Sequence, residues 1–513
     1  MITENCLREL LFLPFQKRRW LRLPVRVARA FARFIARLQK GIPISDLSTN
    51  MAHIRNIKRY AALLACALLG VVAGPVALAT GAAATEPSAL APFPASNIEF
   101  VGYGDGPGLG LGEWGAFGYA VLDHEPYRWI LAHYYGGITL SSGGNIASGD
   151  SMISVDIDDN DGQPVIVTSA SAFSFGGYSF FGGQAVRAVL SSGEWTLSEA
   201  PSCSSRNWAR VASQLVNPVA TPSSLRPSAT SSQVLDICEH GGADFAVRGM
   251  VEAYDAPSGA VTLNILPIEE YVLDVISAEV SWSWGLFGGS DGSPQGQPWG
   301  FQALEAQAVA TRSYVAAELA AGGWEPYATT CDSNCQSYAG MADERPDLDA
   351  AVADTAGQIL EQPAQPAQPA QPAQPAQPAQ PAQPAQPEVP VLADYSASTG
   401  GYTGGGPFPG VVDSGDAICI KSGYYTCNPC HKWLALVPVH AVEKAYESVG
   451  KLAAVEVTQR NGLGALGGRV ETIEIVGTSG AKLSVPSYEL EPLLARANPD
   501  HCASDWFGVV NGP

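Results

Sequence analysis

The strongest constraint on the fold is a change in the spacing of hydrophobic residues near Leu266. From Asn97 to Leu266 the chain has short runs of alternating apolar and polar residues, such as MISVDID and PVIVTSA, divided by turn signals such as Asn-Asp-Gly and Pro-Ser-Gly. Such runs are typical of strands joined by hairpins. Beyond Leu266, apolar residues recur every three or four positions over 267–279 and 301–320, which predicts helices. We therefore expect an α+β fold, rich in antiparallel sheet, with a β-rich N-terminal region packed beside a helix-containing region.

The N-terminal part of the chain differs from the rest in charge. Residues 1–59 hold 13 Lys or Arg and three acidic residues, whereas the remainder holds 16 basic and 46 acidic residues. From Met51, a basic stretch, an apolar run over 60–79 and a tail of small residues follow the order of a signal peptide. We interpret 51–84 as a signal peptide or membrane anchor and 1–50 as an over-extended N-terminus. The protein is therefore expected to be extracytoplasmic, with a membrane contact only through this segment, and its acidic body argues against nucleic acid binding.

Cysteine usage supports export. Eight of the ten cysteines remain once Cys6 and Cys66 are set aside, an even number that suits an oxidised protein. Cys331 and Cys335 form the likeliest bridge by their spacing, and the other pairings stay open: Cys203, Cys238, Cys419, Cys427, Cys430 and Cys502. The run CNPCH fits the haem attachment pattern with His431 as axial ligand. We expect no haem, because the cysteines nearby suit disulfides, and no zinc, because a second Cys/His pair at ligand spacing is missing.

A Gln-Pro-Ala repeat over 362–387 interrupts the second half of the chain. Such a composition favours extended polyproline II conformation and does not build a core. The repeat stands between two strand-like pieces, GQIL and VLADYSAS, so we predict an expanded hairpin loop rather than a domain linker. A long insertion adds little to the entropic cost of closing a loop, so such a repeat can expand without having a function.

Three blocks together resemble a known family. LPIEEYVLDVISAEV (Leu266–Val280), ALEAQAVATRSYV (Ala303–Val315) and CQSYAG (Cys335–Gly340), the last followed by YSASTGGYT (Tyr395–Thr403), resemble the stage II sporulation protein D and amidase-enhancer (SpoIID/LytB) family in its actinobacterial type. The resemblance extends from about 97 to about 509. It divides the chain into a β-rich N-terminal part over 97–265, a catalytic core over 266–410 that includes the repeat loop, and a Cys-containing C-terminal part over 411–513.

The resemblance implies one of two functions in the cell wall. Sporulation-type members are lytic transglycosylases, which cleave peptidoglycan glycan strands and leave a 1,6-anhydro product. Amidase-enhancer members bind the wall without catalysis and stimulate an autolytic amidase. Glu279 matches the catalytic glutamate of the first type, and a single carboxyl suffices because the 6-hydroxyl of the sugar itself attacks. This chemistry needs a raised pKa at the carboxyl, for which Trp282 and Trp284 are expected to provide an apolar setting.

Other positions carry over from the same blocks as candidates for substrate binding or for support of the acid: Gln307, Arg312, Tyr314, Gln336, Tyr338, Tyr395, Ser396, Ser398, Gly400, Gly401 and Thr403. Arg312 lies on the apolar stripe of its predicted helix, so its charge needs a partner. That partner is either a structural carboxylate or the active-site acid, Glu279, and the sequence favours neither over the other.

One segment departs from the family pattern. The glycine-rich block reads GYGDGPGLGLGEWGAFGYA (Gly102–Ala120), with Asp105 where His is usual and Glu113 where Gln is usual. These departures bear on activity more than on fold, and they keep the amidase-enhancer alternative open. Should Glu279 not be the acid, Glu113 and Glu270 are the next candidates. The expected partners are peptidoglycan glycan strands and, under the alternative, a cell-wall amidase.

Overall fold

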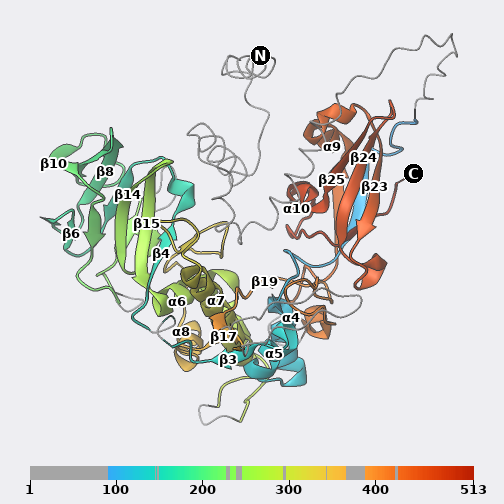
Figure 1. The fold of residues 1–513 in the computed structure, drawn as a ribbon, viewed down its shortest axis with the longest axis horizontal. Coiled ribbons are helices and arrows are strands. Elements are labelled where there is room, and N and C mark those ends of the chain that lie inside the picture. The colour runs from blue at the N-terminus through green and yellow to red at the C-terminus, as the bar shows by residue number, and fades with distance from the viewer. Residues whose placement is uncertain are drawn as a thin grey trace, which may run out of the picture. The chain divides into compact units, whose positions relative to one another are not determined.

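The computed structural model describes residues 90–144, 146, 149–226, 231–238, 245–292, 296–342, 344–364, 387–421 and 426–512. The predicted over-extended N-terminus (1–50), the signal or anchor segment (51–84) and the interior of the repeat lie outside these residues. Residues from Thr85 to the end form one compact unit. Within the described part of the chain, no helix has both the length and the apolar character needed to cross a membrane. The predicted α+β fold, rich in antiparallel sheet, is confirmed (Figure 1).

Two antiparallel sheets make up the β-rich region before Leu266. The first, in spatial order, contains β16 (Thr330–Cys331), β4 (Met152–Asp156), β15 (Gly259–Pro267), β14 (Met250–Ala256), β11 (Val219–Thr221), β6 (Phe173–Phe175) and β7 (Tyr178–Phe180). The second contains β10 (Ala209–Leu215), β9 (Glu194–Ala200), β8 (Ala185–Ser191), β5 (Val165–Thr168), β12 (Leu235–Ile237) and β13 (Phe245–Val247). Within these two sheets, β16 is the only strand that pairs in parallel, and its partner is β4. Buried side chains of both sheets belong to one hydrophobic core, which continues into the helices.

The helices after Leu266 form the layer that positions the site. They are α6 (Ile268–Glu279), η5 (Trp282–Leu286), α7 (Phe301–Ala320) and α8 (Pro346–Asp354), together with α4 (Glu113–Gly118), η3 (Tyr119–Asp123) and α5 (Tyr127–Tyr135) from the glycine-rich block onward. The sequence indicated one apolar stripe on α7, but this helix is buried on nearly all sides up to Ala316. It packs against α4, α5, α6 and α8, and its alanines let these neighbours approach closely (Figure 1).

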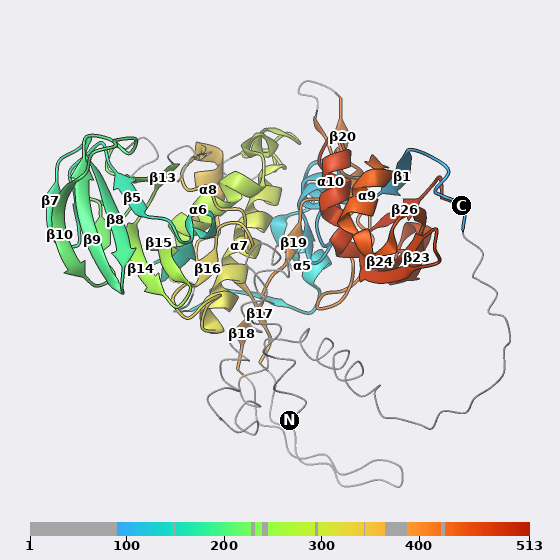
Figure 2. The ribbon, with the colours of Figure 1, turned by 90° about the horizontal axis from the view of Figure 1, so that it is seen from above.

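The third part of the fold has its own core, formed by the ends of the chain. One sheet contains β22 (Trp433–Pro438), β1 (Asn97–Gly102) and β26 (Phe507–Val509), and another contains β23 (Leu452–Arg460), β24 (Val470–Gly477) and β25 (Lys482–Pro486). Helices α9 (Val439–Ala445) and α10 (Glu491–Ala497) pack on β22 (Figure 2). The predicted domain boundaries stay predictions, although two segments of 97–265 lie outside the two β-rich sheets. Residues 97–102 pair with the C-terminal part, and 113–135 are mostly helical, because α4 and α5 pack on α7.

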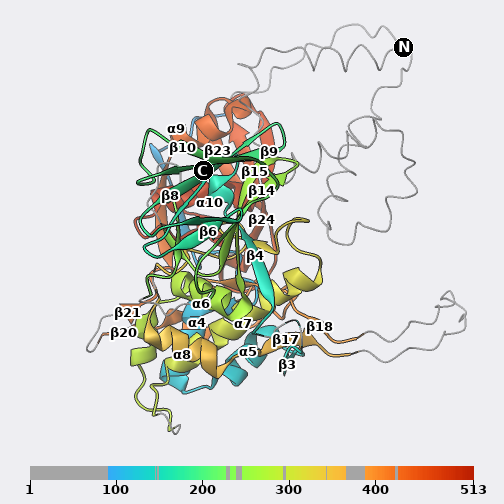
Figure 3. The same ribbon diagram turned by 90° about the vertical axis from the view of Figure 1, so that its left-hand side faces the viewer.

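Three small sheets join these parts. They contain β18 (Val389–Pro390), β17 (Ile359–Gln362) and β3 (Thr139–Ser141); β19 (Tyr395–Ser396) and β2 (Leu111–Gly112); and β20 (Cys419–Ile420) and β21 (Thr426–Cys427). The strands on either side of the repeat, β17 and β18, pair antiparallel, as the expanded-hairpin hypothesis predicted (Figure 3). Short helical turns complete the chain at η4 (Asp158–Asn160), η6 (Ser414–Ala417), η7 (Glu447–Val449), η8 (Ala465–Gly467) and η9 (Ser487–Leu490).

All eight cysteines beyond the N-terminal segment are bridged. The pairs are Cys203–Cys238, Cys331–Cys335, Cys419–Cys427 and Cys430–Cys502. The predicted Cys331–Cys335 bridge is confirmed, and the pairings left open are now assigned. The two cysteines of the CNPCH run bond to different partners, so neither sulfur is left for a haem thioether. The disulfides are consistent with an extracytoplasmic location.

Candidate catalytic site around Glu279

Glu279 is the last residue of α6, a helix that begins directly after β15 and is buried along most of its length. The helix ends here because Val280 adopts extended backbone. The half-buried carboxyl receives two hydrogen bonds on Oε1, from the backbone N–H of Ser337 at 2.8 Å and from the hydroxyl of Tyr395 at 2.9 Å. Burial raises the pKa of Glu279, and the hydrogen bonds from Ser337 and Tyr395 act against that rise.

A chain of polar side chains continues from this carboxyl into the core. The Tyr395 hydroxyl lies 2.9 Å from Gln336 Oε1, and Gln336 Nε2 donates to the Tyr271 hydroxyl at 3.0 Å. The Cys331–Cys335 bridge closes the turn directly before Gln336 and thus supports the segment that contacts Glu279. Of the predicted site residues, Tyr395 therefore contacts Glu279 directly, and Gln336 contacts Tyr395. Sequence reasoning missed Tyr271, which it counted as an apolar helix position, and the Ser337 amide.

Glu113 enters the same site from the glycine-rich block. It follows β2, which pairs in parallel with β19, and the next N–H, that of Trp114, donates to Ala397 O at 3.1 Å. The Glu113 side chain is only 4% exposed, and its Oε1 has no hydrogen-bond partner among the described residues. Burial raises the pKa of Glu113 well above its usual value, and the charges on Glu279 and Asp105 raise it further. The departure from Gln to Glu thus adds a buried carboxyl next to the strand pair that carries Tyr395.

The two tryptophans predicted to surround Glu279 differ in their environment. Trp284 is buried, with its ring stacked on Phe117 at 4.7 Å and tilted against Trp114 at 5.1 Å. It therefore packs on the helix that begins with Glu113. Trp282 is 40% exposed, so its ring faces solvent for a large part. Trp284 therefore lies among aromatic side chains of the helix that Glu113 begins, whereas the exposed part of the Trp282 ring is accessible to a ligand.

Of the two partners considered for Arg312, a structural carboxylate and the active-site acid, the structure shows a structural carboxylate. The fully buried guanidinium of Arg312 binds Glu269 through two hydrogen bonds, Nε to Oε1 at 3.0 Å and Nη2 to Oε2 at 2.7 Å. Glu269 lies at the start of α6, whereas Glu279 lies at its end. The remaining Arg312 N–H groups donate to the carbonyls of Gln358 and Val352. Arg312 therefore ties α7 to the first turn of α6, at the opposite end of that helix from Glu279.

Most of the other carried-over residues serve the core. Gln307 is buried and donates to Thr311 on its own helix, Tyr314 is half-buried, and Ser396 is buried. Tyr338 donates to Asn264 and to Asp274 within a buried group of acids around Arg248. Glu270, a fallback candidate for the acid, is bound to the same arginine at 2.8 Å and is not in contact with Glu279. Thr403 holds its own loop through Pro409 and Val411.

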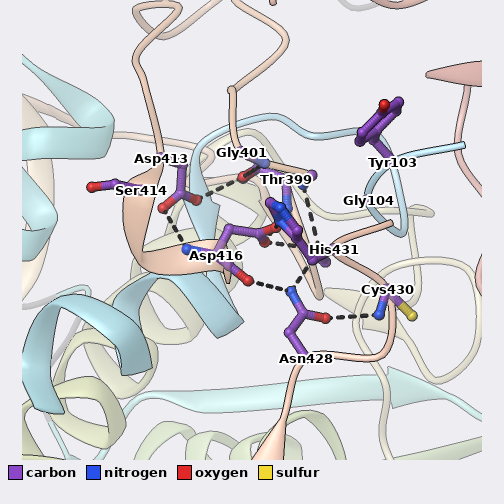
Figure 4. A network of polar contacts seen from close by, with 12 residues as sticks. Tyr103, Gly104, Thr399, Gly401, Asp413, Ser414, Asp416, Asn428, Cys430 and His431 are labelled. Carbon is purple, nitrogen blue, oxygen red and sulfur yellow. Dashed lines mark hydrogen bonds and ion pairs between the residues drawn. The ribbon is translucent and has the colours of Figure 1, made fainter. Parts of the chain in front are cut away.

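A second polar network surrounds Asp416, at the far end of the serine-rich turn (Figure 4). The buried carboxylate of Asp416 accepts from the Ser398 hydroxyl at 2.7 Å and from the Thr399 N–H at 2.9 Å. Its other oxygen lies 2.7 Å from Nδ1 of the partly exposed His431. Asn428 donates to both Ser398 Oγ and the backbone carbonyl of Asp416. The Asn428 and His431 positions of the CNPCH run therefore fix a loop rather than a haem.

The glycines of this turn permit a close backbone approach. Gly400 has a φ of +74°, and a Cβ there would meet the backbone of Gly104 at 2.7 Å. Gly401 has a φ of +102° and lies against the ring of His431. Beside them, burial raises the pKa of Asp413 to about 7, with the charge of Asp416 adding to the rise. Within the described residues, no group of three His, Cys, Asp or Glu side chains is arranged to hold a metal ion.

Together, the fold and site define an α+β protein with four internal disulfides and a half-buried carboxyl held by a tyrosine and a backbone donor. Comparison with known families gives a match over residues 257–361 to the model described as SpoIID, stage II sporulation protein. The matched segment contains Glu279, Arg312 and Gln336, but neither Glu113 nor Tyr395. The match supports membership of the SpoIID family and a function related to the cell wall. No curated protein and no solved structure matches it.

Proposed function

We propose that this protein is a peptidoglycan lytic transglycosylase, with Glu279 as the general acid and base. The observation that carries the proposal is the setting of Glu279. Its carboxyl is half-buried with a raised pKa, and it is held in one orientation by Ser337 and Tyr395. A carboxyl with a raised pKa that does not turn freely is what protonation of a glycosidic oxygen requires.

The reaction balances without water. The bond between C1 of N-acetylmuramic acid and O4 of N-acetylglucosamine breaks as the Glu279 proton passes to O4. The 6-hydroxyl oxygen of the muramic acid forms a new bond to C1, and its proton passes to the Glu279 carboxylate. The products are a free 4-hydroxyl and a 1,6-anhydro sugar, and the enzyme is returned to its starting protonation state. Ordinary glycoside hydrolysis instead adds water and needs a second carboxylate to activate it or to attack.

Peptidoglycan as substrate is supported by the family match and by the kind of polar groups at the site. Tyr395 and Gln336 offer hydroxyl and amide groups, which suit hydrogen bonding to sugars. Beyond residue 59 the acidic residues outnumber the basic ones nearly threefold, so attraction to an anionic polymer does not supply the affinity. Trp282, with 40% of its surface exposed, is a candidate for stacking on a sugar ring.

The test is digestion of purified sacculi with the mature protein, followed by mass spectrometry of the soluble fragments. Wild type should release 1,6-anhydromuropeptides. Glu279→Gln keeps the volume of the side chain but removes its proton chemistry, so product formation should fall by about 10²–10⁴-fold. Glu305→Gln is the matched control, because Glu305 is also a buried glutamate with an unpaired oxygen, but lies on α7 without a contact to Glu279. This control should retain wild-type activity.

The amidase-enhancer alternative gives a different result in the same experiment. Wild type would then release no anhydro product, and both wild type and Glu279→Gln would stimulate a cell-wall amidase equally. Equal cleavage by wild type and Glu279→Gln would show that another residue is the acid. Of the two fallback candidates, Glu113 is buried with an oxygen that has no partner among the described residues, whereas Glu270 is already bound to Arg248.

A further inference from the structure

A group of aromatic rings lies at the surface of α5 and η3, on elements other than those that hold Glu279. Trp129 and His133 are one turn apart on α5, and their rings stack with centres 5.0 Å apart and planes 7° apart. Tyr119 begins η3, and its ring is inclined at 64° to both, at 5.2 Å from Trp129 and 5.0 Å from His133. These three side chains form an aromatic platform.

One face of the Trp129 ring is left open. Tyr119 is nearly equidistant from the centres of the other two rings, so it lies beside the stack and does not cover the outer face of Trp129. Trp129 is 39% exposed, although tryptophan is highly buried on average. The outer face of the indole is therefore presented to solvent.

Hydrogen bonds on the inner side hold the platform in place. The Tyr119 hydroxyl donates to Val412 O at 3.1 Å and accepts the Ser414 N–H at 3.1 Å. His133 Nε2 lies 3.1 Å from the same Val412 carbonyl. Rings held in this way are ordered before a ligand arrives, so binding does not cost the entropy of ordering them.

The edge of the platform offers a hydrogen-bond acceptor. A carbonyl oxygen only accepts, so His133 carries its proton on Nε2, which leaves Nδ1 as an acceptor in the neutral ring. Burial lowers the pKa of His133, which favours this neutral form at pH 7. A flat aromatic face beside a neutral acceptor matches a pyranose ring, whose C–H groups pack on the face and whose hydroxyl groups donate at the rim.

The segment that carries the platform has a second stack of the same kind. Its η3 is a π-helix, a form that is rare and frequent at functional sites. His124 caps this helix in the left-handed conformation, with a φ of 58°, and its ring stacks on the half-buried Trp299 at 4.9 Å and 13°. Two tryptophan–histidine stacks on one short segment suit a ligand made of repeated rings.

We infer that the aromatic platform is a second carbohydrate-binding surface, at which Trp129 stacks on an N-acetylated sugar of a glycan strand outside the catalytic site. The class of ligand rests on the proposed function, but binding at this surface needs no catalysis. A protein partner fits less well, because a stable interface covers about 800 Å² on each side and is depleted of charge at its centre. The exposed residues of α5 and η3 include charged ones, Arg128 and Asp123.

The direct test is NMR of the mature Glu279→Gln protein labelled with ¹⁵N at its tryptophan indoles, because this variant should leave glycan intact. Peptide-free glycan fragments, released from sacculi with an amidase and a muramidase, are added in steps. The Trp129 signal, assigned by its loss in Trp129→Phe, should shift in a saturable manner, whereas the signal of the fully buried Trp195 should stay in place. A Trp129 signal that does not move, whether or not that of Trp282 does, would overturn the inference.

Co-sedimentation with intact sacculi measures what the platform adds to affinity. Trp129→Ala should raise the dissociation constant about fivefold, the size expected for the loss of one ring contact. Phe181→Ala is the matched control and should bind as wild type does, because Phe181 is 80% exposed but lies between β7 and β8 in the β-rich region. An unchanged dissociation constant for Trp129→Ala would contradict the inference. So would a wild-type dimer that Trp129→Ala dissociates without a change in glycan affinity, since the surface would then bind a second copy.

The two proposals fail separately. If wild type makes no anhydro product but the Trp129 signal responds to glycan, the platform stands and the proposed function is wrong. If wild type makes the product and Trp129→Ala binds sacculi as tightly as wild type, the platform is wrong and the proposed function stands.

Discussion

Replacement of Arg312 by alanine tests whether this residue belongs to the structure or to the reaction. The guanidinium is fully buried and donates to both oxygens of Glu269 and to the carbonyls of Gln358 and Val352. Glu269 also accepts the Gly357 N–H at 3.0 Å, so it keeps one donor when the arginine is removed. Its side chain is 19% exposed, and water therefore compensates only part of the loss.

The expected cost follows from this geometry. Removal of one partner from a buried ion pair typically destabilises by about 3–5 kcal/mol, because the other charge is left without compensation. The single remaining donor and the partial exposure of Glu269 place Arg312→Ala at the lower end of that range. Arg312→Lys should also destabilise, since an ammonium group cannot bind both carboxylate oxygens in the planar arrangement. A loss of this size is a large fraction of the stability of a typical domain, about 5–15 kcal/mol.

Urea-induced unfolding of the oxidised protein, followed by tryptophan fluorescence, measures the cost. Lys451→Ala is the control, because Lys451 forms an exposed ion pair with Glu443 and its loss should not move the midpoint. In the same samples, the folded fraction of Arg312→Ala should release anhydro product at the wild-type rate. A midpoint unchanged from wild type, or a folded variant that is inactive, would refute the structural assignment of Arg312.

Three further results are expected. Burial raises the pKa of Glu305 from 4.5 to about 7, so the folded state retains a proton that the unfolded chain releases. The stabilising contribution of the Glu305 proton is complete below pH 4.5 and is lost as the pH rises through about 7. The unfolding free energy of Glu305→Gln should therefore depend less on pH than that of wild type. An equal pH dependence would contradict this. Replacement of both Cys331 and Cys335 by serine should lower anhydro-product formation in folded protein, because the bridge precedes Gln336, whereas loss of the Cys203–Cys238 bridge should affect stability alone. Thiol labelling of the denatured, unreduced mature protein should leave all eight bridged cysteines unmodified, and four or more labelled sites would count against the pairing.

The sequence predicted the kinds of elements better than their contacts. Alternating runs gave the strands before Leu266, and the turn between β14 and β15 falls at the predicted Pro-Ser-Gly signal. The same pattern missed the helices of 113–135, whose apolar residues are interrupted by glycines. It also missed that β1 joins the C-terminal part, because a single strand carries no information about a partner more than three hundred residues away.

Arg312 shows where local reasoning ends. Its burial was expected from the apolar stripe, and so was the need for a carboxylate. The choice between Glu269 and Glu279 was not available, because both lie on α6, ten residues apart or about 15 Å along the helix axis. Which end of α6 lies beside the middle of α7 is decided by the packing of the whole helical layer.

The site itself depends on pairings that no local pattern indicates. Tyr395 lies 116 residues from Glu279, with the repeat between them, and reaches it through a strand of only two residues. Such a strand is too short to show a period. The family resemblance gave Glu279, Gln336 and Tyr395 as separate positions. The hydrogen bonds that connect them, and the position of Glu113, can be seen only in the folded chain.

The serine-rich turn explains why two polar networks occur in one protein. Tyr395 contacts Glu279 at one end of the turn, and Ser398 and Thr399 bind the buried Asp416 only three and four residues later. A chain of four residues spans at most about 14 Å, so the position of the Tyr395 hydroxyl is limited by where Asp416 holds the turn. A tyrosine on an unrestrained loop would sample many positions, and its hydrogen bond would do little to orient the acid. The Asp416 network, which includes His431, therefore contributes to the Glu279 site by fixing the backbone that presents Tyr395, although its side chains are not in contact with the acid.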